Sequence, residues 1–431
     1  MGGHRRRRAE PGAGVAMDVM EDRCAGADLG KADVKVCVRV PGTGRRARYE
    51  VRTFSTMSDG LLELRDWLVE NDITRIGMEA TASYWKPLFY LLEATEGIEP
   101  WLLNAQHIKT VPGRKTDVKD CEWICRLVEH GLVRPSFVPP RDIRQLRDLT
   151  RYRTETTRDR TRDVNRLSMF LEDTGIKLSS VVSDITGRSA RAMLDALVAG
   201  ERDPRVLADL ALGSLQGKVP LLTRALTGSF SEHHAFMVAS MLRAIDEAND
   251  RIARLSEEIS RQLQPLRQQV DLLITIPGIS LTLAQVLIAE IGVDMDRFTT
   301  AGHLASWAGV CPGNKESAGK RLSGRTRHGD TWLKTALFVA GSTAARSKGT
   351  YLGAQFRRLV PHRGSKRATL AVGHSILVAA WHILHDLVPY RDLGPDYFTS
   401  RLGRERQTRR LLAQLSALGL DVTVTPHIEP T

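Results

Sequence analysis

The chain has 431 residues, of which 42% are hydrophobic and 26% charged, as expected of a globular protein with two to three domains. Arginine carries the excess in the net charge of +12, and because arginine binds phosphate bidentately, a nucleic-acid partner is the leading interpretation. Five cysteines without a CxxC pair argue against a zinc site and fit a reducing cytoplasm. We find no apolar stretch of about 18 residues and expect no membrane partner.

Residues 1–22 are predicted to form a disordered basic tail. A basic run at His4–Arg8 is followed by Pro11–Gly14 instead of an apolar core, which argues against a secretory signal peptide. The first strand is expected only near Ala25. Translation could therefore begin at any of three methionines, Met1, Met17 and Met20.

Residues 23–140 alternate between strand and helix patterns. Period-two alternation and turn residues predict three antiparallel strands, at 25–29, 34–40 and 48–54. Apolar spacing then predicts four further elements: helix 58–70, strand 75–79, helix 83–95 and strand 99–103. This order predicts an α/β domain with a mixed sheet.

Two long amphipathic helices are predicted in the region 141–268. Apolar residues recur among dense charges over 141–171, and again at near-heptad spacing over 233–263. The two helices are separated by short helical segments and could pair antiparallel as a coiled-coil arm.

The region 269–390 is predicted to be a mainly α-helical domain. Pro277 and Gly278 separate two apolar stretches within 272–292, a pattern of either a phosphate-binding helix-hairpin-helix unit or an ordinary packing unit. A buried apolar helix is predicted at 369–388. The remaining tail, 391–431, is expected to fray.

The segment 311–370 holds 13 lysines and arginines against two acidic residues, Glu316 and Asp330. We expect its first half to contact phosphates through Lys315, Lys320, Arg321, Arg325, Arg327 and Lys334. A merely solvated positive face is the alternative. Few aromatic residues lie among these side chains, which favours contacts to duplex backbones over stacking on single-stranded bases.

Four acidic residues are spaced as a metal site requires: Asp28, Glu79, Asp117 and Asp120. Asp28 and Glu79 end apolar strands, where an unpaired buried carboxylate would be costly. Asp117 and Asp120 share one face at a predicted helix start, where helix capping is the alternative explanation. Oxygen ligands select Mg²⁺, with Mn²⁺ as an alternative, and such ions promote phosphodiester cleavage.

These residues resemble the RuvC-like, RNase H-fold domain of the DEDD insertion-sequence transposases, which are bridge-RNA-guided recombinases related to the pilin-gene invertases. The matching segments are Gly26–Lys31, Met78–Thr81 with Tyr84, and Lys115–Asp120. The family usually has glycine where Ala82 stands and alanine where Cys121 stands. The resemblance implies an RNase H-like fold, Mg²⁺ held by the four carboxylates, and a guide RNA as partner.

The C-terminal half resembles the second domain of the same family. Its matching segments are Ile276–Ile279, Ala308–Pro312, Ser317–Arg321 and His328–Lys334. In the family, a serine of this loop joins covalently to DNA, and by position this is Ser317. The family more often has glycine where the next residue, alanine, stands. The resemblance also implies a composite site in a homodimer or homotetramer, with carboxylates from one protomer and serine from another.

The residues alone favour Ser317 less strongly than the resemblance does. A serine hydroxyl needs activation before it attacks, and a loop serine more often forms a turn or a cap. Lys315, Lys320 and Arg321 could hold the phosphate and stabilise its transition state. Ser323 is the nearest competitor for the nucleophile.

Together these patterns predict a transposase-type DNA recombinase that breaks and rejoins DNA through a phosphoserine intermediate. Two alternatives stay open. The first is a metal-only, structure-specific nuclease of Holliday-junction type, in which water is the nucleophile. The second is a non-enzymatic nucleic-acid-binding protein whose acidic residues are structural. A cytoplasmic, nucleoid-associated location is expected.

Overall fold

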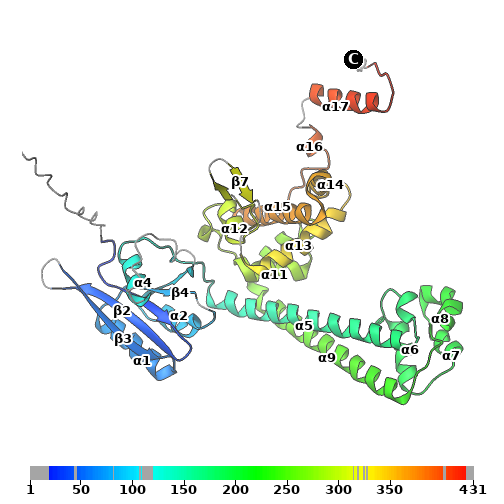
Figure 1. Ribbon diagram of the computed structural model, residues 1–431, viewed down its shortest axis with the longest axis horizontal. Coiled ribbons are helices and arrows are strands. Elements are labelled where there is room, and N and C mark those ends of the chain that lie inside the picture. The colour runs from blue at the N-terminus through cyan, green and yellow to red at the C-terminus, as the bar shows by residue number, and fades with distance from the viewer. Residues whose placement is uncertain are drawn as a thin grey trace, which may run out of the picture. The chain divides into compact units, whose positions relative to one another are not determined.

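The computed structural model describes residues 19–42, 46–80, 82–105, 108, 120–313, 315–317, 320–323, 326, 329–400 and 404–423 (Figure 1). The chain divides into two compact units, Met1–Val138 and Pro139–Thr431. Most of the predicted N-terminal tail, residues 1–18, lies outside the described residues.

A five-stranded mixed sheet forms the centre of the first unit, in the order β3-β2-β1-β4-β5. Its strands are β1 (Cys24–Leu29), β2 (Asp33–Pro41), β3 (Ala47–Ser55), β4 (Arg75–Glu79) and β5 (Glu99–Leu103). The first three strands pair antiparallel, whereas β4 runs parallel to both β1 and β5. The predicted meander, the later strands and the mixed sheet are confirmed.

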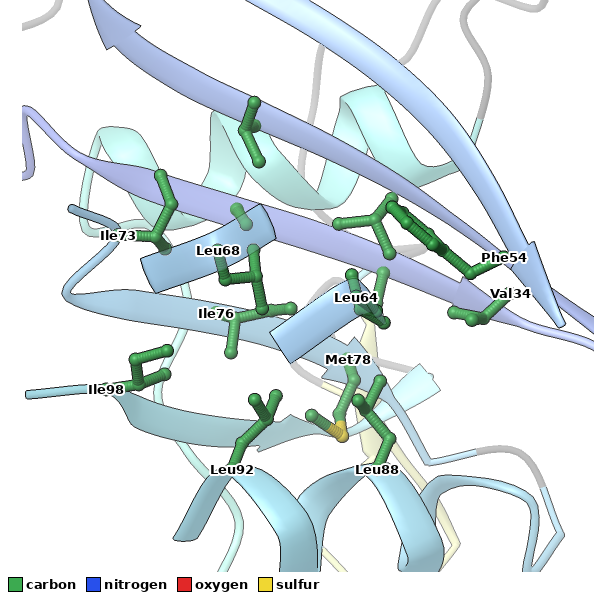
Figure 2. Close-up of a cluster of buried hydrophobic side chains, with 14 of the residues drawn as sticks. Val34, Phe54, Leu64, Leu68, Ile73, Ile76, Met78, Leu88, Leu92 and Ile98 are labelled. Carbon is green, nitrogen blue, oxygen red and sulfur yellow. The ribbon is translucent and has the colours of Figure 1, made fainter. Parts of the chain in front are cut away.

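Two helices, α1 (Ser58–Glu70) and α2 (Trp85–Glu93), pack against one face of this sheet. Period-two alternation directs the apolar side chains of the strands to this face. Figure 2 shows Leu88 and Leu92 of α2 pointing toward Met78 of β4 within the same cluster. Full burial of each such side chain contributes about 1.5–3 kcal/mol to the free energy of folding. This layer is the main apolar core of the unit because, among the described residues, more buried apolar side chains lie here than on the opposite face of the sheet.

The opposite face is covered by α4 (Asp120–Glu129). Glycine is required at two strand positions below this helix. A Cβ atom on Gly26 would lie 2.2 Å from the backbone nitrogen of Cys125, and one on Gly77 would lie 2.7 Å from Cγ2 of Val128. The two glycines therefore set how closely α4 approaches β1 and β4.

Glu129 fastens the end of α4 to the sheet. Its carboxylate accepts hydrogen bonds from Arg39 Nε at 3.1 Å and from the Tyr49 hydroxyl at 2.6 Å. Its backbone carbonyl accepts from the N–H groups of Met20 and Glu21. The chain is thus tied to this unit shortly before β1 begins.

In the second unit, α5 (Arg141–Asp173) and α9 (Glu232–Gln262) lie side by side (Figure 1). Arg153 hydrogen-bonds Ser256 and Arg160 hydrogen-bonds Asn249, so the two helices run antiparallel. The predicted antiparallel pairing of the two long helices is confirmed.

Short helices follow α5 and pack with the ends of both long helices in one apolar cluster. These segments are η1 (Leu178–Ser180), α6 (Arg188–Val198), α7 (Pro204–Asp209), η2 (Gly213–Lys218) and α8 (Val219–Ala225).

The rest of the second unit is helical apart from one hairpin. Its helices are η3 (Gln264–Leu266), α10 (Arg267–Ile274), α11 (Leu281–Ile291), η4 (Met295–Arg297), α12 (Ala301–Trp307), α13 (Thr331–Arg346), α14 (Tyr351–Arg363), α15 (Ser365–Asp386), α16 (Tyr397–Ser400) and α17 (Arg404–Ala417). The hairpin consists of β6 (Lys315–Ser317) and β7 (Lys320–Ser323).

The turn between α10 and α11 packs against α13. Gly278 has a φ of +94°, which glycine adopts without strain. A Cβ atom there would lie 2.5 Å from the backbone oxygen of Ala340. Of the two alternatives for this segment, the contact favours a packing unit.

Helix α15 corrects one sequence expectation. Within the described residues it is long and apolar enough, by length and composition, to span a bilayer, so the statement that no such stretch exists was wrong. Half of its apolar window is buried inside the protein, where the helix packs with α13 and α14. These contacts are those of a core helix.

Candidate active site

Asp28 and Glu79 occupy matching positions on two neighbouring parallel strands. Ala27 of β1 pairs with Met78 of β4, and the two acidic residues are the next along each strand. Side chains alternate along a strand, so Asp28 shares the face of Gly26, and Glu79 shares the face of Gly77. Both glycines contact α4, and the two carboxyl groups therefore lie on the α4 face of the sheet.

The N-terminus of α4 brings a third acidic residue to this edge. Cys121 lies over Gly26, close to Asp28 at the end of β1, and Asp120 is the first residue of the helix. Asp28 is half-buried, and burial is the main cause that raises the pKa of its carboxyl group. The negative charge of Asp120 raises this pKa further, whereas Lys35, its cross-strand partner, lowers it. We call Asp28, Glu79 and Asp120 the carboxylate edge.

The carboxylate edge has the chemistry of a site for a hard cation. The carboxylates of Asp28 and Asp120 repel each other, and a divalent cation bound between them would relieve this repulsion. A donor set made only of oxygen atoms fits Mg²⁺ or Mn²⁺. In the described part of the chain, no three histidine, cysteine or acidic side chains are grouped closely enough to hold a metal ion. Asp117, the fourth predicted ligand, lies outside the described residues.

Ala82, just after β4, is one of the positions at which this chain departs from the family pattern. Its φ is +46°, in the left-handed region that glycine adopts without cost and alanine does not. The family that the sequence resembles usually has glycine at this position. Alanine is locally strained there.

Ser317 lies in a hairpin, whereas the sequence predicted an irregular loop. It is the last residue of β6 and pairs with Lys320, the first residue of β7. Lys315 pairs with Ser323 at the other end of the hairpin. Ser317 therefore adjoins the two-residue connection and Ser323, its competitor, does not. The two residues between Ser317 and Lys320 are Ala318 and Gly319, and this sequence is not one of the strong two-residue hairpin signals such as Asn-Gly or Asp-Gly.

The predicted phosphate-binding residues are only partly described. Lys315, Lys320 and Arg321 are strand residues of the hairpin. Arg325 and Arg327 lie outside the described residues. Lys334 lies in the first turn of α13 and is partly buried. This burial lowers the pKa of its ammonium group.

A buried ionic cluster beside the start of α13 was missed by sequence reasoning. Glu290 of α11 is fully buried, and its two oxygens accept hydrogen bonds from Nε and Nη2 of Arg151, both at 2.8 Å. Arg147 approaches the same carboxylate at 3.1 Å. Burial raises the pKa of Glu290, and the two arginines oppose that shift.

The same cluster reaches the residues that follow the hairpin. Nη2 of Arg151 lies 3.2 Å from Asp330, whose carboxylate caps α13 by accepting a hydrogen bond from the N–H of Leu333. The guanidinium groups of Arg151 and Arg158 also contact the ring of Trp332. A lone glutamate in the apolar run of α11, with arginines four residues apart on α5, was the signal available in the sequence.

Two family models match this chain. One, described as a transposase, matches residues 25–176, which include the carboxylate edge. The other, described as the transposase IS116/IS110/IS902 family, matches residues 270–357, which include Ser317. The chain belongs to the IS110-type transposases.

Two curated relatives agree with this membership. The y4pF/y4sB protein of Sinorhizobium fredii, which is named as a transposase, is 23% identical over 379 residues, covering 84% of this chain and 88% of that protein. The 42 kDa protein of insertion element IS900 from Mycobacterium paratuberculosis is 26% identical over 304 residues, covering 64% of this chain and 73% of that protein. As an IS110-type transposase, the protein belongs to a class of enzymes that cut and transfer DNA.

Proposed function

We propose that this IS110-type transposase breaks and rejoins the DNA of a mobile element, with the carboxylate edge and Ser317 as the two halves of its active site. One observation carries the proposal. Asp28 and Glu79 stand at matching positions of parallel strands, on the face covered by α4, and Asp120 at the start of α4 is close enough to raise the pKa of Asp28.

We assign the first unit to the RNase H-like, RuvC-like class. The support is a mixed sheet with helices on both faces and acidic residues at the ends of its central strands. Asp28, Glu79, Asp117 and Asp120 would hold Mg²⁺ or Mn²⁺, which when bound neutralises the scissile phosphate and assists the nucleophile. Because burial and Asp120 disfavour the ionised form of Asp28, cation binding there would release a proton at low pH.

The chain's own groups account for cutting and rejoining. The Ser317 hydroxyl oxygen attacks the phosphorus, loses its proton, and forms a phosphoserine ester as the bond from phosphorus to the deoxyribose oxygen breaks. The leaving oxygen takes up a proton. A deoxyribose hydroxyl then attacks the ester, restores a phosphodiester and frees Ser317. Lys315, Lys320 and Arg321 would hold the phosphate during both steps.

Guide RNA and assembly complete the proposal. The family resemblance supports a guide RNA that recognises element ends and target by base pairing, a division of labour that leaves backbone contacts to the protein. It also supports a homodimer or homotetramer in which the carboxylates and Ser317 come from different protomers. The antiparallel pair α5 and α9 is our candidate for a coiled-coil assembly element.

Two substitutions separate this proposal from its alternatives. Purified protein with the flanking RNA, element ends and target DNA should recombine DNA with Mg²⁺ present. S317A should abolish recombination, whereas a metal-only nuclease would keep cutting. D28N should abolish Mg²⁺-dependent strand breakage, whereas unchanged breakage would show that the acidic residues are structural.

A further inference from the structure

A stretch of the second unit carries positive charge without any acidic residue. Between Asp330 and Asp386 the sequence has no aspartate or glutamate and eight basic residues: Lys334, Arg346, Lys348, Arg357, Arg358, Arg363, Lys366 and Arg367. The phosphate contacts predicted from the sequence used only the first of these. The stretch forms α13, α14 and nearly all of α15.

Three of the eight basic residues lie where α14 ends and α15 begins, and we call them the α14–α15 corner: Arg363, Lys366 and Arg367. All three are exposed. Arg357 and Arg358 lie earlier on α14, toward Gly353 and Phe398 respectively. The backbone from Arg363 to Arg367 can extend over at most about 15 Å. B-DNA presents about nine phosphate charges over that length, so several phosphates are within reach of one such cluster.

The charge at this corner is not compensated as it is on the long helices. Exposed arginines of α5 and α9 pair with acidic residues three positions away, as Arg162 does with Asp159 and Arg261 with Glu258. Between Asp330 and Asp386 the sequence supplies no acidic residue, and the next two, Asp392 and Asp396, belong to the segment that packs against the start of α14. Lys366 and Arg367 also stand in the first turn of α15, where like charge opposes the helix dipole. The placement therefore opposes helix stability, as expected when charge serves an external anion.

The aromatic residues that pack with α14 indicate which form of nucleic acid fits. The rings of Tyr351 and Phe398 stack at 5.1 Å, and Tyr397 packs edge-on against both. The Arg358 guanidinium lies over Phe398 at 4.4 Å. These rings contact one another and α14, so they do not form a platform for unstacked bases. Contacts to the backbone of a duplex need only the exposed cations.

We propose that the α14–α15 corner binds the phosphate backbone of double-stranded DNA, as a second contact surface in addition to the predicted basic residues of the hairpin and Lys334. The proposal rests on the proposed function, because a DNA-transferring enzyme must hold duplex DNA on either side of the cut. It concerns binding alone and requires neither the carboxylate edge nor Ser317.

The test is the salt dependence of duplex DNA binding by the full-length chain, without divalent metal. The variant is R363A/K366A/R367A, which spares Arg358 with its ring contact and Arg357, which packs over Gly353. Each lost phosphate contact reduces the slope of log K against log salt by about 0.9. If the variant loses three contacts, its affinity depends less on salt than that of the wild type. Between 50 and 200 mM salt, the wild-type affinity should therefore fall about 40-fold more than the affinity of the variant.

Two matched proteins keep the test decisive. The variant R162A/R166A/R261A removes the same net charge from exposed, acid-paired positions and should leave the salt slope unchanged. The variant R363K/R367K keeps the charge and should bind like the wild type, even if the alanine variant folds poorly.

Three outcomes would overturn the proposal: an unchanged slope in the corner variant, an equal change in the acid-paired control, or a loss confined to duplex RNA. Any of these would leave the proposed function standing if D28N and S317A still abolish recombination. Failure of those two substitutions would instead refute the proposed function while the DNA-binding result stood.

Discussion

Replacing Arg151 with alanine tests the buried ionic cluster directly, because Arg151 makes two hydrogen bonds to the fully buried Glu290 carboxylate. Removing one partner of a fully buried pair costs about 3–5 kcal/mol. Arg147 remains 3.1 Å from Glu290, and Arg151 is itself 32% exposed, so both features reduce the loss. We expect R151A to lower the free energy of unfolding by about 2–3 kcal/mol.

The loss in R151A should depend on pH in a defined direction. Burial already raises the pKa of Glu290, and removal of Arg151 raises it further. The folded variant then holds a proton at pH values at which the unfolded chain has released it. The penalty is therefore largest above the raised pKa of Glu290, and it shrinks as pH falls toward the unfolded glutamate value of about 4.3.

Urea unfolding of full-length wild type, R151A, E290Q and the double variant at pH 7 and pH 5 measures this effect. The double variant should be less destabilised than the sum of the single variants by about 1 kcal/mol or more, because no uncompensated carboxylate remains. R162A, at an exposed ion pair, is the control and should change stability by less than about 1 kcal/mol. A loss in R151A no larger than in R162A, or strict additivity, would refute the reasoning.

Two further predictions concern the carboxylate edge and the residue Ala82 that follows β4. In metal-free protein, D120N should lower the pKa of the Asp28 carboxyl group, as measured by NMR titration. D33N should lower the same pKa less, because Asp120 makes the larger contribution. An unchanged midpoint in D120N would place Asp120 away from Asp28. A82G should raise the free energy of unfolding by up to about 1 kcal/mol, because glycine removes the strain of a positive φ. The control is A94G at the end of α2, where φ is negative, and this variant should not be stabilised. A destabilised A82G would contradict the strain at this position.

The sequence predicted the first unit well because its signals are local. Strand 75–79 and strand 99–103 have the predicted bounds, since each is a short apolar run bounded by polar or turn residues. The carboxylates of Asp28 and Glu79 stood out because each ends such a run. Their alignment is a property of strand pairing, which spacing along the chain does not reveal.

The second unit was harder to predict because its key contacts are long-range. Glu290 and Arg151 are 139 positions apart, and only the packing of α11 on α5 brings them together. The hairpin was missed because Lys315, Glu316 and Ser317 show no apolar alternation. Helix α15 was predicted as a buried apolar helix, but the length of its apolar stretch was underestimated.

The most direct test of the central claim is capture of the covalent intermediate. Purified transposase with its flanking RNA, Mg²⁺ and a nicked or mismatched DNA substrate that blocks rejoining should yield a protein–DNA adduct. Peptide mass spectrometry should place the DNA on Ser317, and the adduct should be absent from S317A and D28N but present in S323A. An adduct at another residue, or cleavage at wild-type rates by S317A with no adduct at all, would contradict the account.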